Sequence, residues 1–272
     1  MQTHLICYAD SNMTISQQLC MKSAQEIGKI DNVYSYNPSS LDRPFYHRYK
    51  HILEADQRAG GKGFWLWKPY IVESAIRALP EGDILIYCDS GVEWVNKFDH
   101  LYKALSNPQS NCDDILLFGN EHRHVDWCKA EVWAPMLKLT LDAIIRHKQV
   151  QASVIIMRVS EYTRELASRW LAWSCIPGFI DDTLRGPQLR EFSAHRNDQS
   201  ILTNLAIEDG VQLHWWPAQY GHHIKRQYID DWYPQMFYHH RRRNDEWATE
   251  MQKHGLTKDQ AIQRFMNQPK HV

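Results

Sequence analysis

Long apolar segments, paired cysteines and a strong net charge are all missing from this sequence of 272 residues. No stretch approaches the roughly 18 uncharged residues that a membrane-spanning helix requires, and residues 1–4 lack the start of a signal peptide. The six cysteines include no Cys-X-X-Cys pair, which favours a reducing compartment. The formal net charge of −1 provides no global attraction to nucleic acid. We therefore expect a soluble, cytoplasmic protein that does not bind nucleic acid.

Two nucleotide-binding signatures are also absent. The sequence has neither the Walker pattern Gly-X-X-X-X-Gly-Lys-Ser/Thr nor the dinucleotide pattern Gly-X-Gly-X-X-Gly. Tryptophan and histidine are abundant instead, with 11 and 15 residues. Tryptophan often lines ligand clefts because it combines a large apolar surface with one polar group. The length suggests one large domain or two small ones.

The apolar segments alternate between strand and helix. Residues 4–9 are predicted to form a strand, a helix follows toward Gly28, and residues 33–36 form a second strand, which is typical of a βαβ unit. We expect further strands at residues 84–88, 115–118, 154–157 and 211–216, and further helices at 70–79, 97–105, 125–147, 161–173 and 197–208. The pattern predicts an α/β fold in which helices flank a mostly parallel central sheet. This domain spans residues 1–240, and a polar helical tail follows at 241–272.

The clearest buried strand, at residues 84–88, ends at Asp89, Ser90 and Gly91. Ligands of open α/β sheets bind beyond the carboxyl ends of the strands, so Asp89 is expected to point into a cleft. Glu93 is a candidate second oxygen ligand for Mg²⁺ or Mn²⁺. The alternative is that Asp89 only caps a turn.

A glycine-rich stretch at residues 60–63 precedes Trp65, Trp67 and Lys68. Glycines let backbone N–H groups face an anion, Lys62 and Lys68 add positive charge, and a helix N-terminus follows. The alternative is an ordinary loop whose tryptophans belong to the core.

Residues 195–200, His-Arg-Asn-Asp-Gln-Ser, begin a predicted helix. Asp198 in the first turn is favoured by the helix dipole alone. It is also a candidate acceptor for a sugar hydroxyl, or a general base.

Later in the chain, histidines and arginines gather at 222–226 and 239–243. Such runs are usually solvated, but a late histidine with neighbouring arginines could ligate a metal and hold a diphosphate.

Three of these segments, in this order, resemble the nucleotide-sugar glycosyltransferases of GT-A fold, especially the bacterial enzymes that assemble surface polysaccharides such as capsule and O-antigen. The segments are residues 63–69, 83–91 and 195–200. The first strand with Tyr8, Ala9 and Asp10 is similar too, and the resemblance extends to about Trp216.

The resemblance implies that a sugar moves from a nucleoside-diphosphate donor to a hydroxyl of a glycan or glycolipid, with peripheral association at the inner face of the plasma membrane. Asp198 and Asp89 are the expected catalytic residues, and Asp198 is the base if the reaction inverts. The donor-binding residues it implies are Tyr8, Ala9, Asp10, Lys62, Trp67, Lys68, Asp89, Ser90, Gly91 and Gln199. The acceptor-binding residues it implies are Trp127, Lys129 and Gln151.

The metal motif of the resembled family is commonly Asp-X-Asp, whereas this chain has Asp89, Ser90 and Gly91. We expect a divalent cation, Mn²⁺ or Mg²⁺, on Asp89 with Glu93 or His240 completing its shell. The alternative is that lysines and arginines neutralise the diphosphate.

Two other functions are alternatives to a glycosyltransferase. One is a non-catalytic sugar- or nucleotide-binding module, and the other is a sugar nucleotidyltransferase, which would normally show a glycine-rich basic loop after the first strand.

Overall fold

In the computed structural model, the described residues are 1–55, 63–106, 114–136, 141–227 and 232–270. They form a central seven-stranded sheet in the order β2-β1-β3-β7-β5-β6, with β8 paired to β5. Its strands are β1 (Thr3–Tyr8), β2 (Asn32–Tyr36), β3 (Ile84–Asp89), β5 (Ile115–Arg123), β6 (Lys148–Val150), β7 (Val154–Arg158) and β8 (Leu213–Trp215). Strands β1, β2, β3, β5 and β8 run in one direction, and β7 and β6 run in the other. The predicted α/β fold with a mostly parallel central sheet is confirmed.

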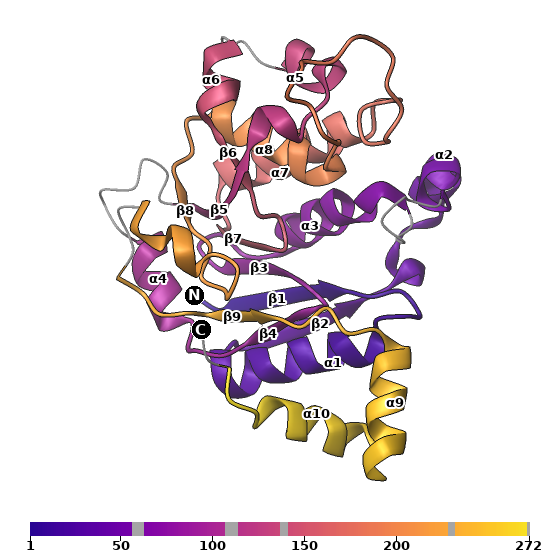
Figure 1. The fold of residues 1–272 in the computed structure, drawn as a ribbon, viewed down its shortest axis with the longest axis vertical. Helices are drawn as coiled ribbons and strands as arrows, with labels where there is room; N and C mark the ends of the chain where they lie inside the picture. The colour runs from indigo at the N-terminus through magenta and orange to yellow at the C-terminus, as the bar shows by residue number, and fades with distance from the viewer. Residues whose placement is uncertain (56–62, 107–113, 137–140, 228–231, 271–272) are drawn as a thin grey trace.

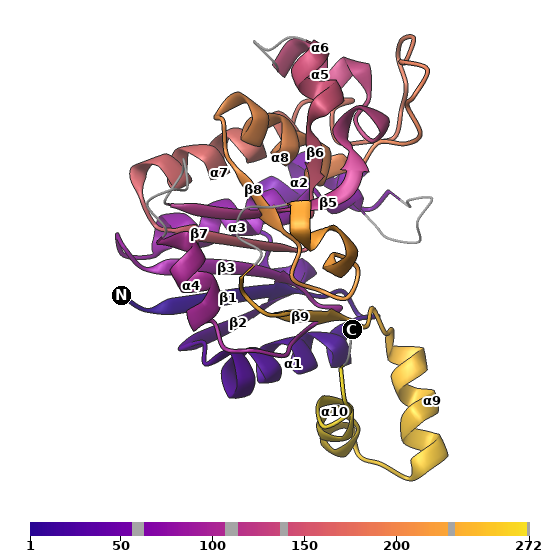
Figure 2. The ribbon, with the colours of Figure 1, turned by 60° about the vertical axis from the view of Figure 1, so that its left-hand side comes forward.

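Helices cover both faces of this sheet (Figures 1 and 2). The helices are α1 (Thr14–Ser23), α2 (Arg43–Leu53), α3 (Trp67–Ala78), α4 (Asp99–Leu105), α5 (Ala130–Met136), α6 (Leu141–Arg146), α7 (Glu161–Ser174), α8 (Asn197–Glu208), α9 (Asn244–His254) and α10 (Lys258–Met266). Helices α3, α7 and α8 bury one face, and α1 and α4 pack on the other. Strand β3 is therefore buried on both sides, which explains why its sequence is apolar without alternation. Among the described residues, no helix is both long and apolar enough to cross a membrane.

The prediction of a single helix over residues 125–147 is wrong. Within that range the described residues form a short 3₁₀ turn at His124–Asp126, then α5 and α6. Pro135 lies inside α5 and has no N–H to donate to the preceding turn, so apolar spacing alone overestimates the helix there.

A second, two-stranded sheet joins β4 (Val92–Trp94) to β9 (Phe237–His239). The pairing is antiparallel, with Val92 opposite His239 and Trp94 opposite Phe237. It brings the chain just after Asp89 beside the segment that leads into the C-terminal helices. No local pattern in the sequence indicates this pairing, because its partners are more than 140 residues apart.

Residues 241–270, expected as a polar tail, contribute a small apolar core of their own. Trp247, Ala261, Ile262 and Phe265 pack with Leu19 of α1. The indole N–H of Trp247 donates to Ser16 Oγ at 2.8 Å. Figure 1 shows α9 and α10 below α1, on the side away from the sheet. Helix α1 is thus enclosed between the sheet and the C-terminal helices.

We predict that Trp247→Ala lowers the free energy of unfolding by about 3–5 kcal/mol, because it empties a fully buried site and leaves Ser16 without its donor. Urea denaturation followed by circular dichroism measures the change. Trp232→Ala is the matched control: Trp232 is 49% exposed, so its loss should change stability by no more than about 0.5 kcal/mol. A loss of no more than about 0.5 kcal/mol for Trp247→Ala would contradict a stabilising role of the C-terminal helices.

Candidate active site

A cleft of about 1300 Å³ opens at the carboxyl ends of β1 and β3. Its floor is formed by residues that follow these two strands, and the N-terminal ends of α3 and α8 reach it from the side. The position agrees with the general location of ligand sites in open α/β sheets.

Lys68 lies at the bottom of this cleft, between two carboxylates. Its Nζ is 3.1 Å from Asp198 Oδ2 and 3.5 Å from Asp89 Oδ1, and it donates to the carbonyl of Ala152 at 3.2 Å. The side chains of Lys68 and Asp198 are 5% and 3% exposed, whereas that of Asp89 is 35% exposed in the cleft. The Tyr87 hydroxyl also donates to Asp89 Oδ1. One buried ammonium thus joins residues from β3, α3 and α8.

The ionisation of this group follows from burial and charge. Burial opposes the charged form of Lys68, but Asp198 and Asp89 more than offset it and raise the pKa of the ammonium. Burial raises the pKa of Asp198 to about 6, and the neighbouring Lys68 limits that rise. At neutral pH the cleft therefore holds one ammonium and ionised Asp198, and Asp198 begins to take up a proton just below neutrality.

The chain reaches Lys68 through three residues in the left-handed region. Gly63, Phe64 and Trp65 have φ values of 73°, 47° and 56°. Bulky side chains adopt this conformation at a cost of about 1–3 kcal/mol each, and such strain persists only where surrounding contacts impose it. A Cβ at Gly63 would lie 2.9 Å from the carbonyl oxygen of Leu53, so glycine is required there. The strained turn places Trp65 and Trp67 on the cleft wall and Lys68 at its floor.

Residues 195–200 fix the loop before α8 and place Asp198 against Lys68. The imidazole of His195 meets the carbonyl of Phe179 at 2.8 Å, and Asn197 Nδ2 donates to the carbonyl of Ile180 at 2.6 Å. These contacts fix the loop before α8, while Asp198 faces Lys68. The helix-dipole explanation of Asp198 is therefore incomplete, since its carboxylate also has a buried cationic partner.

The structure brings together nearly all the predicted donor-binding residues. Those that line the cleft are Tyr8, Ala9, Asp10, Trp67, Lys68, Asp89, Ser90, Gly91 and Gln199. Lys62 lies outside the described residues. The rings of Tyr8 and Trp67 are stacked, with centroids 3.8 Å apart, and form a flat aromatic wall.

The predicted acceptor-binding residues are divided. Gln151 lines the cleft, but Trp127 and Lys129 do not. Trp127 lies behind two lining residues: its ring is 4.9 Å from that of His122, and the guanidinium carbon of Arg196 is 4.2 Å from its ring centroid.

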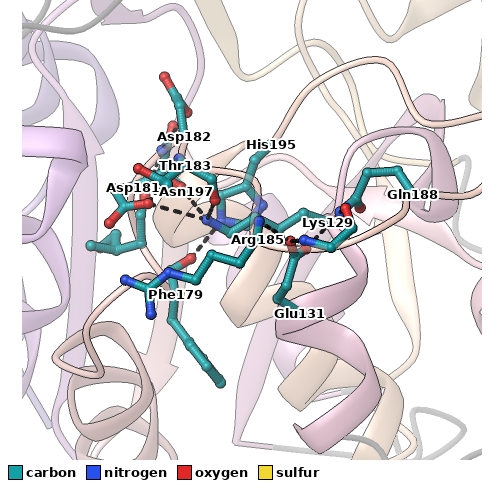
Figure 3. Close-up of polar contacts among 12 residues, drawn as sticks. Lys129, Glu131, Phe179, Asp181, Asp182, Thr183, Arg185, Gln188, His195 and Asn197 are labelled. Carbon is teal, nitrogen blue, oxygen red and sulfur yellow. Dashed lines mark hydrogen bonds and ion pairs between the residues drawn. The ribbon is translucent and has the colours of Figure 1, made fainter.

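Lys129 is fully buried under the loop that forms one rim of the cleft (Figure 3). Its Nζ donates to the carbonyl oxygens of Asp181 and Thr183 and contacts Asp181 Oδ1 at 3.3 Å. Burial lowers the pKa of Lys129, and Asp181 opposes that change.

Glu131 holds the next part of the loop by accepting hydrogen bonds from the backbone N–H groups of Arg185 and Gly186. Both residues are therefore anchors of the rim.

Several lining residues carry no motif that would identify them from the sequence. They are Asn12, Met13, Tyr46, Asn120, His122, Asp182, Thr183, Ser193 and Arg196. Only Arg196 belongs to a segment that the sequence singled out. The others reach the cleft because loops far apart in the chain meet at the sheet edge, and single-sequence patterns do not report such meetings.

Comparison of the structure with solved structures identifies similar proteins. Mouse xyloside xylosyltransferase 1 in its apo form is 11% identical, with a TM-score of 0.50 over 88% of this chain and 97% of that one. The galactosyltransferase LgtC, solved with donor and acceptor sugar analogs, is 13% identical, with a TM-score of 0.50 over 88% of this chain and 87% of that one. This is a GT-A fold. The bifunctional glycosyltransferase WbbM matches 98% of this chain and 50% of its own, at 12% identity and a TM-score of 0.51. By sequence, the chain matches no family model and no curated protein.

The divalent cation that the resemblance to GT-A glycosyltransferases implies does not fit the ligands predicted from this sequence. Glu93 is buried in β4 outside the cleft, 3.1 Å from Lys270 Nζ, and burial raises its pKa to about 7. His240 packs against the ring of Phe265, with centroids 5.3 Å apart, and also lies outside the cleft. His239 faces the cleft instead, because adjacent strand residues point to opposite sides. Within the described ranges, no three His, Cys, Asp or Glu side chains form a group able to hold a metal.

We predict that Lys129→Met speeds amide hydrogen exchange in residues 179–188, because three oxygens of that loop lose their buried donor. Hydrogen–deuterium exchange with mass spectrometry measures it by peptide. Lys148→Met is the control, since Lys148 donates to the carbonyl of Glu121, away from the loop. Unchanged exchange in 179–188 for Lys129→Met would contradict the anchoring role.

Proposed function

We propose that this protein is a glycosyltransferase that moves a sugar from a nucleoside-diphosphate donor to a hydroxyl of a glycan or glycolipid, in surface-polysaccharide assembly. The observation that carries the proposal is the contact of Lys68 with Asp89 and Asp198 at the strand ends of a GT-A fold. This contact holds two carboxylates of different exposure in one large cleft.

The two carboxylates suit different tasks. An acceptor hydroxyl must lose a proton as it attacks the anomeric carbon, and a base works best when its pKa lies near the operating pH. Asp198, whose pKa is raised to about 6, meets that requirement. Asp89 is more exposed, and we assign it to binding hydroxyls of the donor. Lys68 is a positioning residue that holds both carboxylates in place.

The donor and acceptor sides of the cleft differ in chemistry. The stacked rings of Tyr8 and Trp67 offer a flat apolar surface of the kind that binds a nucleobase or a sugar face. The rim held by Lys129 and Glu131 presents Asp182, Thr183 and Ser193. These polar groups suit the hydroxyls of a glycan, so we place the acceptor along this rim.

A panel of UDP, GDP, CDP and ADP tests the donor class. We expect one of them to raise the melting temperature, since a ligand at 100 times its Kd stabilises the native state by about 2.7 kcal/mol. Asp198→Asn, which keeps the shape of the side chain, should bind that nucleotide as well as the wild type does. Its transfer rate with the matching sugar donors should fall at least about 100-fold, the usual contribution of a general base. Binding without turnover by the wild type would instead favour the non-catalytic module.

The pH dependence provides a second test of Asp198. A base acts only when ionised, so kcat/KM should fall about tenfold per pH unit as the pH drops below about 6, where Asp198 takes up its proton. Activity at higher pH is retained because the carboxylate is then charged. Circular dichroism at each pH controls for unfolding. A profile that stays flat down to pH 5 in folded protein would assign the base to another residue.

A further inference from the structure

Three arginines line the cleft without a carboxylate partner. Arg241 and Arg243 follow β9, and Arg196 precedes α8. All three side chains are exposed, and within the described residues none of their guanidinium groups lies within ion-pair distance of a carboxylate. Surface arginines commonly pair with nearby acids, so an unpaired set in a cleft indicates space for an external anion.

The acidic residues of the cleft are already engaged elsewhere. Asp89 and Asp198 contact Lys68, and Asp10 Oδ1 accepts from the backbone N–H of Asn12 at 2.9 Å. The other two acids also have partners: Asp182 accepts from Asn197 at 3.1 Å, and Glu54 lies 3.9 Å from Lys50 Nζ and accepts from Tyr46. None of these five carboxylates therefore forms an ion pair with one of the three arginines, although the charge of Asp182 acts on Arg196 and partly opposes the fall in its pKa.

The backbone of Arg241 is held in place from both sides. Its φ is 52°, in the left-handed region, which costs a residue with a Cβ about 1–3 kcal/mol. The N–H groups of His240 and Arg241 both donate to the carbonyl of Gly91, at 3.0 and 3.2 Å. A Cβ at Gly91 would lie 3.0 Å from the Cα of Arg241. Gly91 is expected to bind the donor. The structure shows that its lack of a side chain also allows the Arg241 backbone to approach, and that its carbonyl connects this backbone to the Asp89 loop.

The segment after Arg241 is fixed to α1. Ser16 Oγ donates to the carbonyl of Arg242 at 2.5 Å, and the backbone N–H of Ile15 donates to Asn244 Oδ1 at 3.1 Å. These bonds hold the strained conformation of Arg241 and keep its side chain at the cleft. Burial, and then the repulsion of Arg241, lower the pKa of Arg196, and the attraction of Asp182 opposes them, so the guanidinium groups of Arg196 and Arg241 lie close enough to interact.

We propose that Arg241, together with Arg196 and Arg243, binds the diphosphate of the donor and supplies the positive charge that a divalent cation supplies in an Asp-X-Asp site. The inference rests on the proposed function for the identity of the anion. A departing diphosphate gains negative charge that must be stabilised where it develops, and an arginine fork suits phosphate oxygens. Among the described residues the three arginines form no ion pair with a carboxylate, and Glu93 and His240 lie outside the cleft; both observations agree with this assignment.

The experiment measures binding of inorganic pyrophosphate by calorimetry in excess EDTA. The wild type should bind, and Arg241→Gly should bind at least about tenfold more weakly, as expected for a lost charge-assisted hydrogen bond. Glycine also relieves the left-handed strain, so the melting temperature of this variant should be equal or higher. Arg241→Gln, a second variant with a side chain of similar reach, should show the same loss of affinity.

Arg242→Met is the matched control. It removes the same charge one residue away, where the arginine packs over the ring of Phe265 outside the cleft, and should change affinity by less than about twofold. Pyrophosphate binding that requires Mn²⁺, or that is equal in wild type, Arg241→Gly and Arg241→Gln, would overturn the proposal, as would no binding at all. Turnover of sugar donors by the wild type is scored separately, so that failure of the diphosphate site and failure of the proposed function are told apart.

Discussion

The buried ammonium of Lys68 is the interaction on which the cleft depends. It contacts Asp89 from β3 and Asp198 from α8, two residues that are 109 positions apart in the chain. An unpaired ion at this depth would be strongly unfavourable, so each member of the group requires the others. The same pairing that makes the site costly to disrupt also fixes the relative positions of its carboxylates.

The segments around this group position Lys68 and Asp198. Three consecutive residues in the left-handed region lead the chain into α3 and place Lys68 at the floor of the cleft. His195 and Asn197 hold the loop before α8 through hydrogen bonds. The strain of the left-handed residues is offset by the large apolar cores on the two faces of the sheet. The site is therefore rigid at its floor, while its rim is assembled from loops.

Prediction from the sequence succeeded where a local pattern carries the information. The apolar run of β3, its terminal Asp89 and the segment around Asp198 are short, contiguous signals, and the structure joins them. Long-range pairings were not predictable in this way. The β4–β9 sheet depends on residues far apart in the chain. Glu93 and His240 are expected beside Asp89, but Glu93 pairs with Lys270 and His240 packs on Phe265, and no local pattern indicates these contacts. The resemblance implies that Lys129 binds the acceptor, whereas its burial under the rim depends on tertiary structure that the sequence does not show.

The contact between Gly91 and Arg241 has a consequence for how the protein is made. On the ribosome, the Asp89 loop emerges some 150 residues before the segment that packs against it. Trp247 and Phe265, which hold that segment to α1, emerge later still. The cleft is consequently completed only after residue 265 has been synthesised, and a nascent chain that already has the central sheet exposes an apolar face of α1 until then. Contacts of such large sequence separation slow folding, so this stage is where we expect chaperones to engage the chain.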